Sequence, residues 1–374
     1  MQRLTAAFIS LLLTAILVTA CGGNDQPSGP PPLTGAPSAT AGRSATATPG
    51  PGTTLLTYHP SDNVTSLAWS PDGKRIATGS STSRGGVIQI WDTNTGQQLL
   101  SFGSPMASIA SLAWSPDGKS IVAAGGFYGG DNAGLRIWDA STGAMRVAIV
   151  TVNKIEGSGA DFIAWSPDGS EIAGAMETAA YPTASNPNFG PTRYSVQLWD
   201  AATGKLLLTY GKHSNQIKSL AWSPDSKLIA SASSDQTVQV WEAATGKTRL
   251  TYRGHKEIVD TVAWSPDGKY LASGGGDNTV QVWEAATGTL LYTYQGHTSE
   301  VMSVAWSPDS KRIVSASYGV TEDHPIQVWD ALTGHHALDY QGLTSGAPVF
   351  VAWAPDGARI ASAIGRTVTV WLAG

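Results

Sequence analysis

Histidine and aspartate are the side chains in this sequence that could carry acid–base or metal chemistry. Seven histidines are present among 374 residues, and three of them, His213, His255 and His297, recur at intervals of 42 residues. The adjacent His335 and His336 could bind a metal ion, but no third ligand is near in sequence. Seven Pro-Asp pairs could supply carboxylates for general acid–base catalysis. Each pair occupies the same turn of a different repeat, so we predict that these aspartates are structural.

The motifs of several common enzyme classes are absent from the sequence. It contains no G-x-S-x-G turn, no H-E-x-x-H motif and no phosphate-binding loop. Cys21 is the single cysteine, which excludes an intrachain disulfide and a cysteine-based metal cluster. Charged residues make up 14% and the net charge is −5, a balance that argues against nucleic-acid binding. We expect no enzymatic activity, no catalytic residue, no metal, no cofactor and no nucleic-acid partner.

The 14 tryptophans divide the sequence after residue 53 into seven repeats. One series stands in the motif A-W-[SA]-P-D-[GS] and comprises Trp69, Trp114, Trp165, Trp222, Trp264, Trp306 and Trp353. The second series alternates with the first and comprises Trp91, Trp138, Trp199, Trp241, Trp283, Trp329 and Trp371. A repeat of about 42 residues with internal turn signals is typical of propellers and other repeat arrays.

One unit, residues 254–294, indicates how each repeat folds. It predicts strands over residues 259–264, 270–273, 279–283 and 290–294, separated by turns that contain Pro, Asp and Gly. Four antiparallel strands make one propeller blade. The fold class is therefore all-β, a seven-bladed propeller. The last unit has no fourth strand after Trp371, and residues 53–58 resemble the fourth strands, so we expect this N-terminal strand to complete the seventh blade.

Residues 53–374 resemble the WD-repeat family. The resemblance rests on the Gly-His pairs at 254–255 and 296–297, an S-x-S/G-x-D turn and the terminal Trp-Asp or Trp-Glu. It implies a hydrogen-bonded tetrad in three blades: His213, Ser231, Asp235 and Trp241; His255, Ser273, Asp277 and Trp283; His297, Ser315, Asp323 and Trp329. The other blades depart from the family pattern, with Gly85, Arg193 and Gly365 at the Asp position and Asn132 in the second unit. We expect those blades to lack the tetrad and to rely on apolar packing.

The N-terminal segment is predicted to lie outside the fold. Residues 4–20 form a run of 17 apolar or small residues, which suits a secretory signal. The sequence from Val18 to Gly22 resembles the bacterial lipobox, which implies that residues 1–20 are a lipoprotein signal peptide and that Cys21 is lipidated. An uncleaved N-terminal anchor is the alternative. Residues 21–52 are rich in Gly, Pro, Ser and Thr and are expected to form a disordered linker. We expect the propeller at 53–374 to be anchored by lipid at the extracytoplasmic face of a cell membrane.

Insertions mark one face of the expected propeller. The first, second, third and sixth units carry extra residues between their second and third strands, and such loops open on one face. Two of these loops combine aromatic residues with Asn and Gly, the composition of a contact surface. The opposite face, with short uniform turns, should tolerate substitution. Predicted partner-binding residues are Phe127, Tyr128, Asp131, Tyr181, Asn186, Asn188, Phe189, Tyr194 and Tyr318.

The central channel offers a second candidate site. The position four residues before each first-series tryptophan should face this channel, and its rim residues include Thr65, Asp161, Lys218, Asp260 and Met302, with Ala110 and Val349 in the two remaining units. This mixed ring matches no metal cage or cofactor pattern. We expect a membrane-tethered, monomeric, non-enzymatic scaffold that binds a protein or peptide partner. The alternative is a propeller that binds, and possibly hydrolyses, a small ligand or glycan in the channel.

Overall fold

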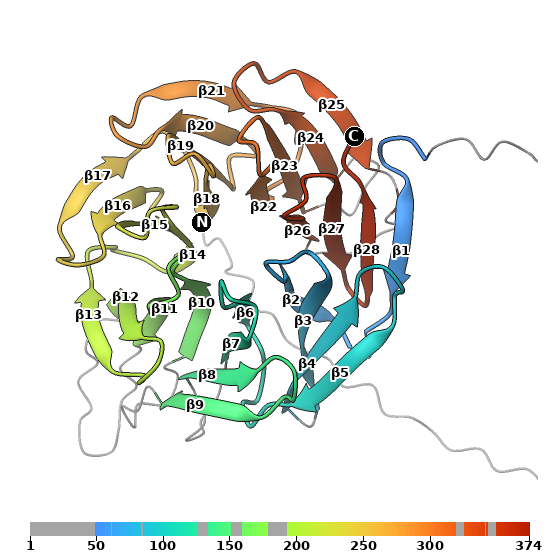
Figure 1. Ribbon diagram of the computed structural model, residues 1–374. Coiled ribbons are helices and arrows are strands. Elements are labelled where there is room, and N and C mark those ends of the chain that lie inside the picture. Colours follow the sequence, from blue (N-terminus) through green and yellow to red (C-terminus); the bar gives the residue numbers. More distant parts are fainter. Residues whose placement is uncertain are drawn as a thin grey trace, which may run out of the picture. The chain divides into compact units, whose positions relative to one another are not determined.

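The computed structural model describes residues 49–60, 62–83, 85–125, 134–150, 159–178, 193–318, 325–340, 342 and 349–374. Within these ranges there are 28 strands and no helix. The strands form seven four-stranded antiparallel sheets, which are the blades of a ring (Figure 1). The predicted seven-bladed propeller is confirmed.

The first four blades follow one another along the chain. Blade 1 contains β2 (Val64–Trp69), β3 (Arg75–Thr82), β4 (Gly85–Asp92) and β5 (Gln98–Gly103). Blade 2 contains β6 (Ser111–Trp114), β7 (Ser120–Gly125), β8 (Gly134–Asp139) and β9 (Met145–Val150). Blade 3 contains β10 (Gly159–Trp165), β11 (Glu171–Thr178), β12 (Arg193–Asp200) and β13 (Leu206–Tyr210). Blade 4 contains β14 (Ile217–Trp222), β15 (Leu228–Ser233), β16 (Val238–Glu242) and β17 (Thr248–Tyr252).

The last three blades complete the ring. Blade 5 contains β18 (Val259–Trp264), β19 (Tyr270–Gly275), β20 (Val280–Glu284) and β21 (Leu290–Tyr294). Blade 6 contains β22 (Val301–Trp306), β23 (Arg312–Ser317), β24 (Ile326–Asp330) and β25 (His336–Tyr340). Blade 7 contains β26 (Val349–Trp353), β27 (Arg359–Ile364), β28 (Thr367–Leu372) and β1 (Thr54–Tyr58).

The N-terminal strand closes the ring, as the sequence predicts. β1 pairs antiparallel with β28, with Thr54 opposite Trp371 and Tyr58 opposite Val368 (Figure 1). The backbone N–H of Leu372 also donates to the carbonyl of Thr53 at 3.0 Å. This pairing covers the outer edge of β28, which would otherwise present unpaired backbone groups.

An aspartate stabilises the turn between the first and second strands in every blade, by accepting from backbone N–H groups of the turn. In blade 5 the hydroxyl of Ser265 donates to Asp267 at 2.6 Å, and the same carboxylate accepts from the backbone N–H of Lys269 at 3.1 Å. Gly268 follows with φ of 73°, a left-handed conformation that costs glycine nothing. The seven Asp side chains of this motif therefore stabilise turns, in agreement with their predicted structural role.

The hydrophobic core lies between neighbouring blades. One buried cluster joins Tyr58, Val368 and Val370 of blade 7 to Trp69 and Ile76 of blade 1. Equivalent clusters recur at the other junctions, so each blade buries its faces against two neighbours. A blade cannot bury both faces alone, which is why closure of the ring matters for stability.

Candidate functional site

Two opposite faces of the ring follow from the strand order. We call the edge that carries the connections between second and third strands the loop-rich face, and the edge that carries the turns between first and second strands, such as residues 265–269, the short-turn face. On the loop-rich face β3, β4, β11 and β12 each extend to eight residues, whereas β19 and β20 have six and five. The insertions of blades 1 and 3 therefore begin as longer hairpins.

Only two of the nine predicted partner-binding residues belong to the part of the chain that the structure describes. Tyr318 is 40% exposed, and its backbone N–H donates to the carbonyl of Glu300 at 2.8 Å. Tyr194 lies in β12 opposite Glu177 and packs partly against the core cluster between blades 3 and 4. Tyr318 is thus the more accessible of the two. The others, Phe127, Tyr128, Asp131, Tyr181, Asn186, Asn188 and Phe189, lie outside the described residues.

The five predicted channel-rim residues share a structural feature that the sequence did not reveal. The pairing of β2, β10, β14, β18 and β22 with the next strand shifts by one residue at the same place. A bulge of this kind redirects the extra side chain. The residues left unpaired at these shifts are Thr65, Asp161, Lys218, Asp260 and Met302. β26 pairs without a shift.

Two of these bulge residues carry carboxyl groups, and of these Asp161 is buried and Asp260 partly buried. Asp161 is 9% exposed and accepts from the side-chain amide of Gln216 at 3.4 Å. Burial raises the pKa of Asp161 to about 6, Glu177 adds to this effect and Lys218 opposes it. Burial also raises the pKa of Asp260, and hydrogen bonding with Glu300 raises it further, while Lys218 again opposes the shift. These two carboxyl groups, which the sequence predicts at the rim of the channel, therefore both lie within the electrostatic reach of Lys218.

One oxygen of each of these two carboxyl groups lacks a partner in the described part of the chain. Asp161 Oδ1 and Asp260 Oδ2 are buried and have no hydrogen-bond partner among the residues that the structure describes. Buried unsatisfied polar atoms are uncommon and mark places where a ligand or water can bind. Thr65 differs, because its hydroxyl donates to the carbonyl of Ile109 at 2.5 Å and thereby ties blade 1 to blade 2. Glu300 was missed from the sequence, because it lies two residues before Met302 rather than at the rim position.

Two predicted tetrads are assembled. In blade 5 His255 Nδ1 lies 3.0 Å from Asp277 Oδ2, and its Nε2 lies 2.8 Å from Ser273 Oγ. Trp283 Nε1 donates to the same hydroxyl at 3.1 Å. Burial alone would raise the pKa of Asp277, but the hydrogen bond and charge of His255 outweigh it and hold the pKa well below its usual range.

Blade 4 contains the matching tetrad of His213, Ser231, Asp235 and Trp241. His213 Nδ1 lies 2.8 Å from Asp235 Oδ2, and Trp241 Nε1 donates to Ser231 Oγ at 3.3 Å. His213 Nε2 lies 2.8 Å from the same Ser231 hydroxyl. The histidine is buried in both blades, which indicates a structural rather than a catalytic role.

The third predicted tetrad, in blade 6, is observed only in part. His297 Nε2 lies 2.7 Å from Ser315 Oγ, and Trp329 Nε1 donates to that oxygen at 3.0 Å. Asp323 lies outside the described residues, and among the described residues His297 Nδ1 has no hydrogen-bond partner. Burial lowers the pKa of His297 to about 4, so this imidazole is neutral at physiological pH.

The blades without the tetrad require one correction. We expected them to depend on apolar packing, but in two of them the tryptophan still donates to a hydroxyl. Trp91 Nε1 donates to Thr78 Oγ1 at 3.1 Å, and Trp371 Nε1 donates to Ser362 Oγ at 3.1 Å. A buried indole N–H needs an acceptor whether or not a histidine is present.

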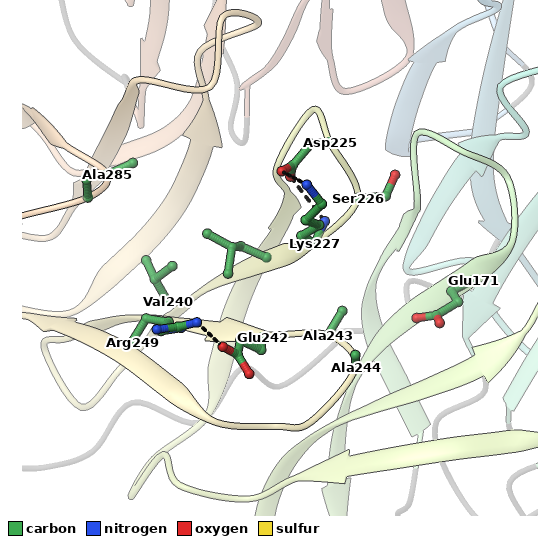
Figure 2. A pocket seen from close by; sticks show the side chains of 12 residues that line it. Glu171, Asp225, Ser226, Lys227, Val240, Glu242, Ala243, Ala244, Arg249 and Ala285 are labelled. Carbon is green, nitrogen blue, oxygen red and sulfur yellow. Dashed lines mark hydrogen bonds and ion pairs between the residues drawn. The ribbon is translucent and has the colours of Figure 1, made fainter.

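The short-turn face contains two cavities that the sequence did not predict. One, of about 530 Å³, spans blades 3 to 5, and Figure 2 shows its walls. Its two cations, Lys227 and Arg249, are paired with Asp225 and Glu242 of the same blade. The other, of about 670 Å³, lies between blades 2 and 3 and is lined in part by Trp165. A third cavity, of about 480 Å³, opens on the loop-rich face between blades 5 and 6.

Five segments of the chain match the family model described as WD domain, G-beta repeat. They cover residues 52–92, 96–139, 204–242, 246–284 and 288–330, which together exceed half of the chain. The chain belongs to this WD-repeat family. The model does not match residues 140–203 or 331–374, yet the structure forms blades 3 and 7 there. WD-repeat propellers are protein-interaction scaffolds, and the family supports that broad role here.

Proteins with similar repeats include eukaryotic ones. The WD repeat-containing protein slp1 of Schizosaccharomyces pombe is 26% identical over 179 residues, which are 47% of this chain and 32% of slp1. Cell division cycle 20.6, cofactor of APC complex, of Arabidopsis thaliana is 25% identical over 182 residues, 47% of this chain and 37% of that protein. The Periodic tryptophan protein 2 homolog of Dictyostelium discoideum is 27% identical over 176 residues, 47% of this chain and 16% of that protein. The matched segment spans about a third of the length of the first two relatives.

Metal and membrane features were also sought in the structure. Within the described ranges no group of three or more His, Cys, Asp or Glu side chains could hold a metal ion. No helix in those ranges is both long and apolar enough to cross a membrane. Cys21 and the whole of residues 1–48 lie outside the described residues, so the lipidation site stays a prediction from the sequence.

Proposed function

We propose that this protein is a membrane-tethered, non-enzymatic scaffold that holds a protein or peptide partner on its loop-rich face. The observation that carries the proposal is the concentration of added length on that face, where four strands extend to eight residues and the insertions follow. Loops on a rigid scaffold commonly carry binding. Membership of the WD-repeat family supports the scaffold role, and one relative is named as a cofactor of a complex.

The tether in this proposal rests on the sequence around Cys21. Its resemblance to a lipobox favours a lipid anchor at the extracytoplasmic face of a cell membrane, with the propeller as a monomer. Membrane fractionation and mass spectrometry of the N-terminal peptide test this. An acylated Cys21 in the membrane fraction supports the tether, and an unmodified N-terminus in a soluble fraction contradicts it.

Blade 6 offers a matched pair of substitutions for the binding face. Tyr318 is 40% exposed on the loop-rich face, and Leu332 is 48% exposed in the turn between β24 and β25 on the short-turn face. A partner is first captured from membranes with the intact propeller. Tyr318→Ala should then weaken binding by about 1–2 kcal/mol, as expected for an aromatic side chain in an interface. Leu332→Ala should leave binding unchanged. A larger loss of binding in Leu332→Ala than in Tyr318→Ala would contradict the assignment of binding to the loop-rich face.

The buried carboxyls favour a second candidate function. Asp161 and Asp260, predicted at the rim of the channel, each have a buried oxygen without a hydrogen-bond partner among the described residues, and both lie near the cation of Lys218. This arrangement suits a small ligand or glycan that donates hydrogen bonds or carries positive charge, with hydrolysis as a further option for raised carboxyl pKa values. A glycan array and a panel of polyamines, tested on the intact propeller and on Asp161→Asn, distinguish the two functions. Binding that Asp161→Asn abolishes would favour the channel.

A further inference from the structure

The first residue of the second strand lies at the junction between blades on the short-turn face. The guanidinium of Arg75 lies over the ring of Trp114 in the next blade, 4.6 Å from its centroid. Arg312 lies in the same way over Trp353 at 5.0 Å, and Arg359 lies over Trp69 at 5.1 Å. Three of the seven junctions therefore contain a cation–π contact between adjacent blades, and we call these side chains arginine plugs.

Each arginine plug also binds backbone carbonyls of the next blade. Arg75 Nη2 donates to the carbonyl of Gly118 at 3.1 Å, and Arg359 Nη2 donates to that of Gly73 at 2.9 Å. Arg359 also donates to the hydroxyl of Thr93 at 3.2 Å. A planar guanidinium can stack on an indole and donate to several acceptors at once, which a lysine cannot do.

Three other junctions have a different residue at this position, and two of these residues, Leu228 and Glu171, line the cavity of about 530 Å³. Tyr270 stacks on Trp306, with ring centroids 6.4 Å apart and an interplanar angle of 18°. Leu228 packs against the cluster that contains Trp264. The junction between blades 3 and 4 has Glu171 at this position.

The junction between blades 2 and 3 is open. Ser120 stands at the plug position and has the shortest side chain of the seven residues found there. A cavity of about 670 Å³ opens here, and Trp165 and Gly169 are among its lining residues. The other six first-series tryptophans are buried, at 9% exposure or less, whereas Trp165 is only half-buried. The most accessible of the seven indoles is therefore the one that faces Ser120, the shortest side chain at the plug position.

We propose that this open junction is a binding site for the guanidinium group of an arginine side chain on a partner polypeptide. The chain itself supplies the template, because arginine plugs fill the corresponding space at three other junctions. The site lies on the short-turn face, so it does not depend on the function proposed for the loop-rich face. A binding site here would also limit the expectation from the sequence that the short-turn face tolerates substitution.

The lining chemistry matches an arginine. Gly169 corresponds in sequence to Gly73 and Gly118, whose carbonyls accept from arginine plugs, and its carbonyl accepts from Trp165 Nε1 at 3.1 Å with a second lone pair left. Asp117 and Asp168 line the cavity. Hydrogen bonds from Ser115 and the Lys119 backbone lower the pKa of Asp117, so its carboxylate is charged at neutral pH.

The cation already present in the cavity is neutralised by its own blade. Arg146 bonds to the carboxylate of Asp139 and donates to Ser120 Oγ at 3.1 Å. These two bonds hold its guanidinium at the Ser120 side of the cavity. Lys119 Nζ lies 3.8 Å from Asp117 Oδ2, but both side chains are exposed, so this pair is weak. The carboxylates of Asp117 and Asp168 can therefore attract a second cation, and the ring of Trp165 can stack on it.

The test uses the tryptophan indole N–H signals in nuclear magnetic resonance spectra of the full chain. The probes are a blocked peptide with one arginine and two versions with lysine or citrulline in its place. The Trp165 signal, identified from the spectrum of Trp165→Leu, should shift on addition of the arginine peptide. The lysine and citrulline peptides should bind at least fivefold more weakly, and equal affinity of all three peptides overturns the proposal.

Ser120→Arg tests the template directly, because it should install a fourth arginine plug. We expect this variant to lose the peptide-induced shift and to melt at a higher temperature than the natural chain. Leu228→Arg is the matched control at the same position two blades away, and it should keep peptide binding. Undiminished binding by Ser120→Arg would overturn the proposal. If Ser120→Arg melts at a lower temperature than the natural chain, the Trp165→Leu variant is used in its place. We expect Trp165→Leu to weaken peptide binding roughly 3- to 30-fold. Unchanged peptide affinity in Trp165→Leu would contradict the proposal.

Discussion

Tyr252 of blade 4 stacks on Trp283 of blade 5, with ring centroids 4.4 Å apart and an interplanar angle of 3°. The tyrosine hydroxyl also donates to Gln281 of blade 5 at 2.6 Å. The same pair recurs at other junctions, where Tyr210 stacks on Trp241 and Tyr294 stacks on Trp329. The outermost strand of one blade is thus joined to the tetrad tryptophan of the next.

This stacking predicts a large cost for losing one tyrosine ring. Tyr252→Leu removes an aromatic pair and leaves Gln281 without its buried partner, so the free energy of unfolding should fall by roughly 2–4 kcal/mol. Urea denaturation followed by tryptophan fluorescence measures the change. Tyr318→Leu, at an exposed tyrosine, is the control and should change stability by less than about 0.5 kcal/mol. Similar losses of stability in Tyr252→Leu and Tyr318→Leu would contradict a specific contribution of the Tyr252–Trp283 stack.

The N-terminal strand should be essential for a closed ring. A chain that begins after Tyr58 lacks β1, which leaves the edge of β28 unpaired, so it should lose several kcal/mol of stability and self-associate. A chain that begins at Pro49 keeps β1 and is the control. Calorimetry and analytical ultracentrifugation measure both effects. An unchanged melting temperature without β1 would contradict the role assigned to this strand.

The tetrad aspartate should stabilise the protein in a pH-dependent way. Asp277→Ala removes the partner of His255 Nδ1 and should cost roughly 1–3 kcal/mol at pH 7. Because the pKa of Asp277 is depressed in the folded state, its contribution is complete above the unfolded pKa of about 4 and is lost as the pH falls below it. The difference between the two proteins should therefore shrink in acid, as measured by urea midpoints from pH 7 to pH 3.

The control for that experiment should be Glu257→Ala, an exposed carboxylate in the same blade. Asp168 is a poorer control, although it is exposed, because its carboxylate accepts hydrogen bonds from Ser166 at 2.7 Å and from the hydroxyl of Ser170 at 2.8 Å. Equal losses at Asp277 and Glu257 would refute the energetic role of the tetrad.

The buried channel carboxyl predicts the opposite dependence on pH. The pKa of Asp161 is raised to about 6 in the folded state, so folding favours its neutral form. Stability should accordingly decline as the pH rises from about 4, the unfolded pKa, through 6. Asp161→Asn should remove that decline and raise the melting temperature at pH 7.5 relative to the natural chain. If Asp161→Asn instead lowers the melting temperature at pH 7.5, the ionised carboxylate of Asp161 stabilises the folded state, which would contradict this prediction.

The repeat pattern in the sequence determined the architecture of this protein. The spacing of the 14 tryptophans and the Pro-Asp turns predicted the blades, and strands such as β18 and β21 have the predicted bounds. The strand predicted over residues 270–273 is longer in the structure and ends at Gly275, because its pairing with the neighbouring strands continues beyond the apolar residues. The partners of His213 and His255 are those that the resemblance to the WD-repeat family implied, and each tetrad lies within one repeat.

Relations between blades were decided only by the tertiary structure. Arg75 and Trp114, or Tyr252 and Trp283, meet because adjacent sheets pack face to face, and no local spacing specifies how far apart those faces lie. The raised pKa of Asp161 likewise depends on burial beside Gln216 and Lys218 of another blade. Local periodicity specifies the hydrogen bonds within a blade, whereas the desolvation and stacking between blades arise only when the ring closes.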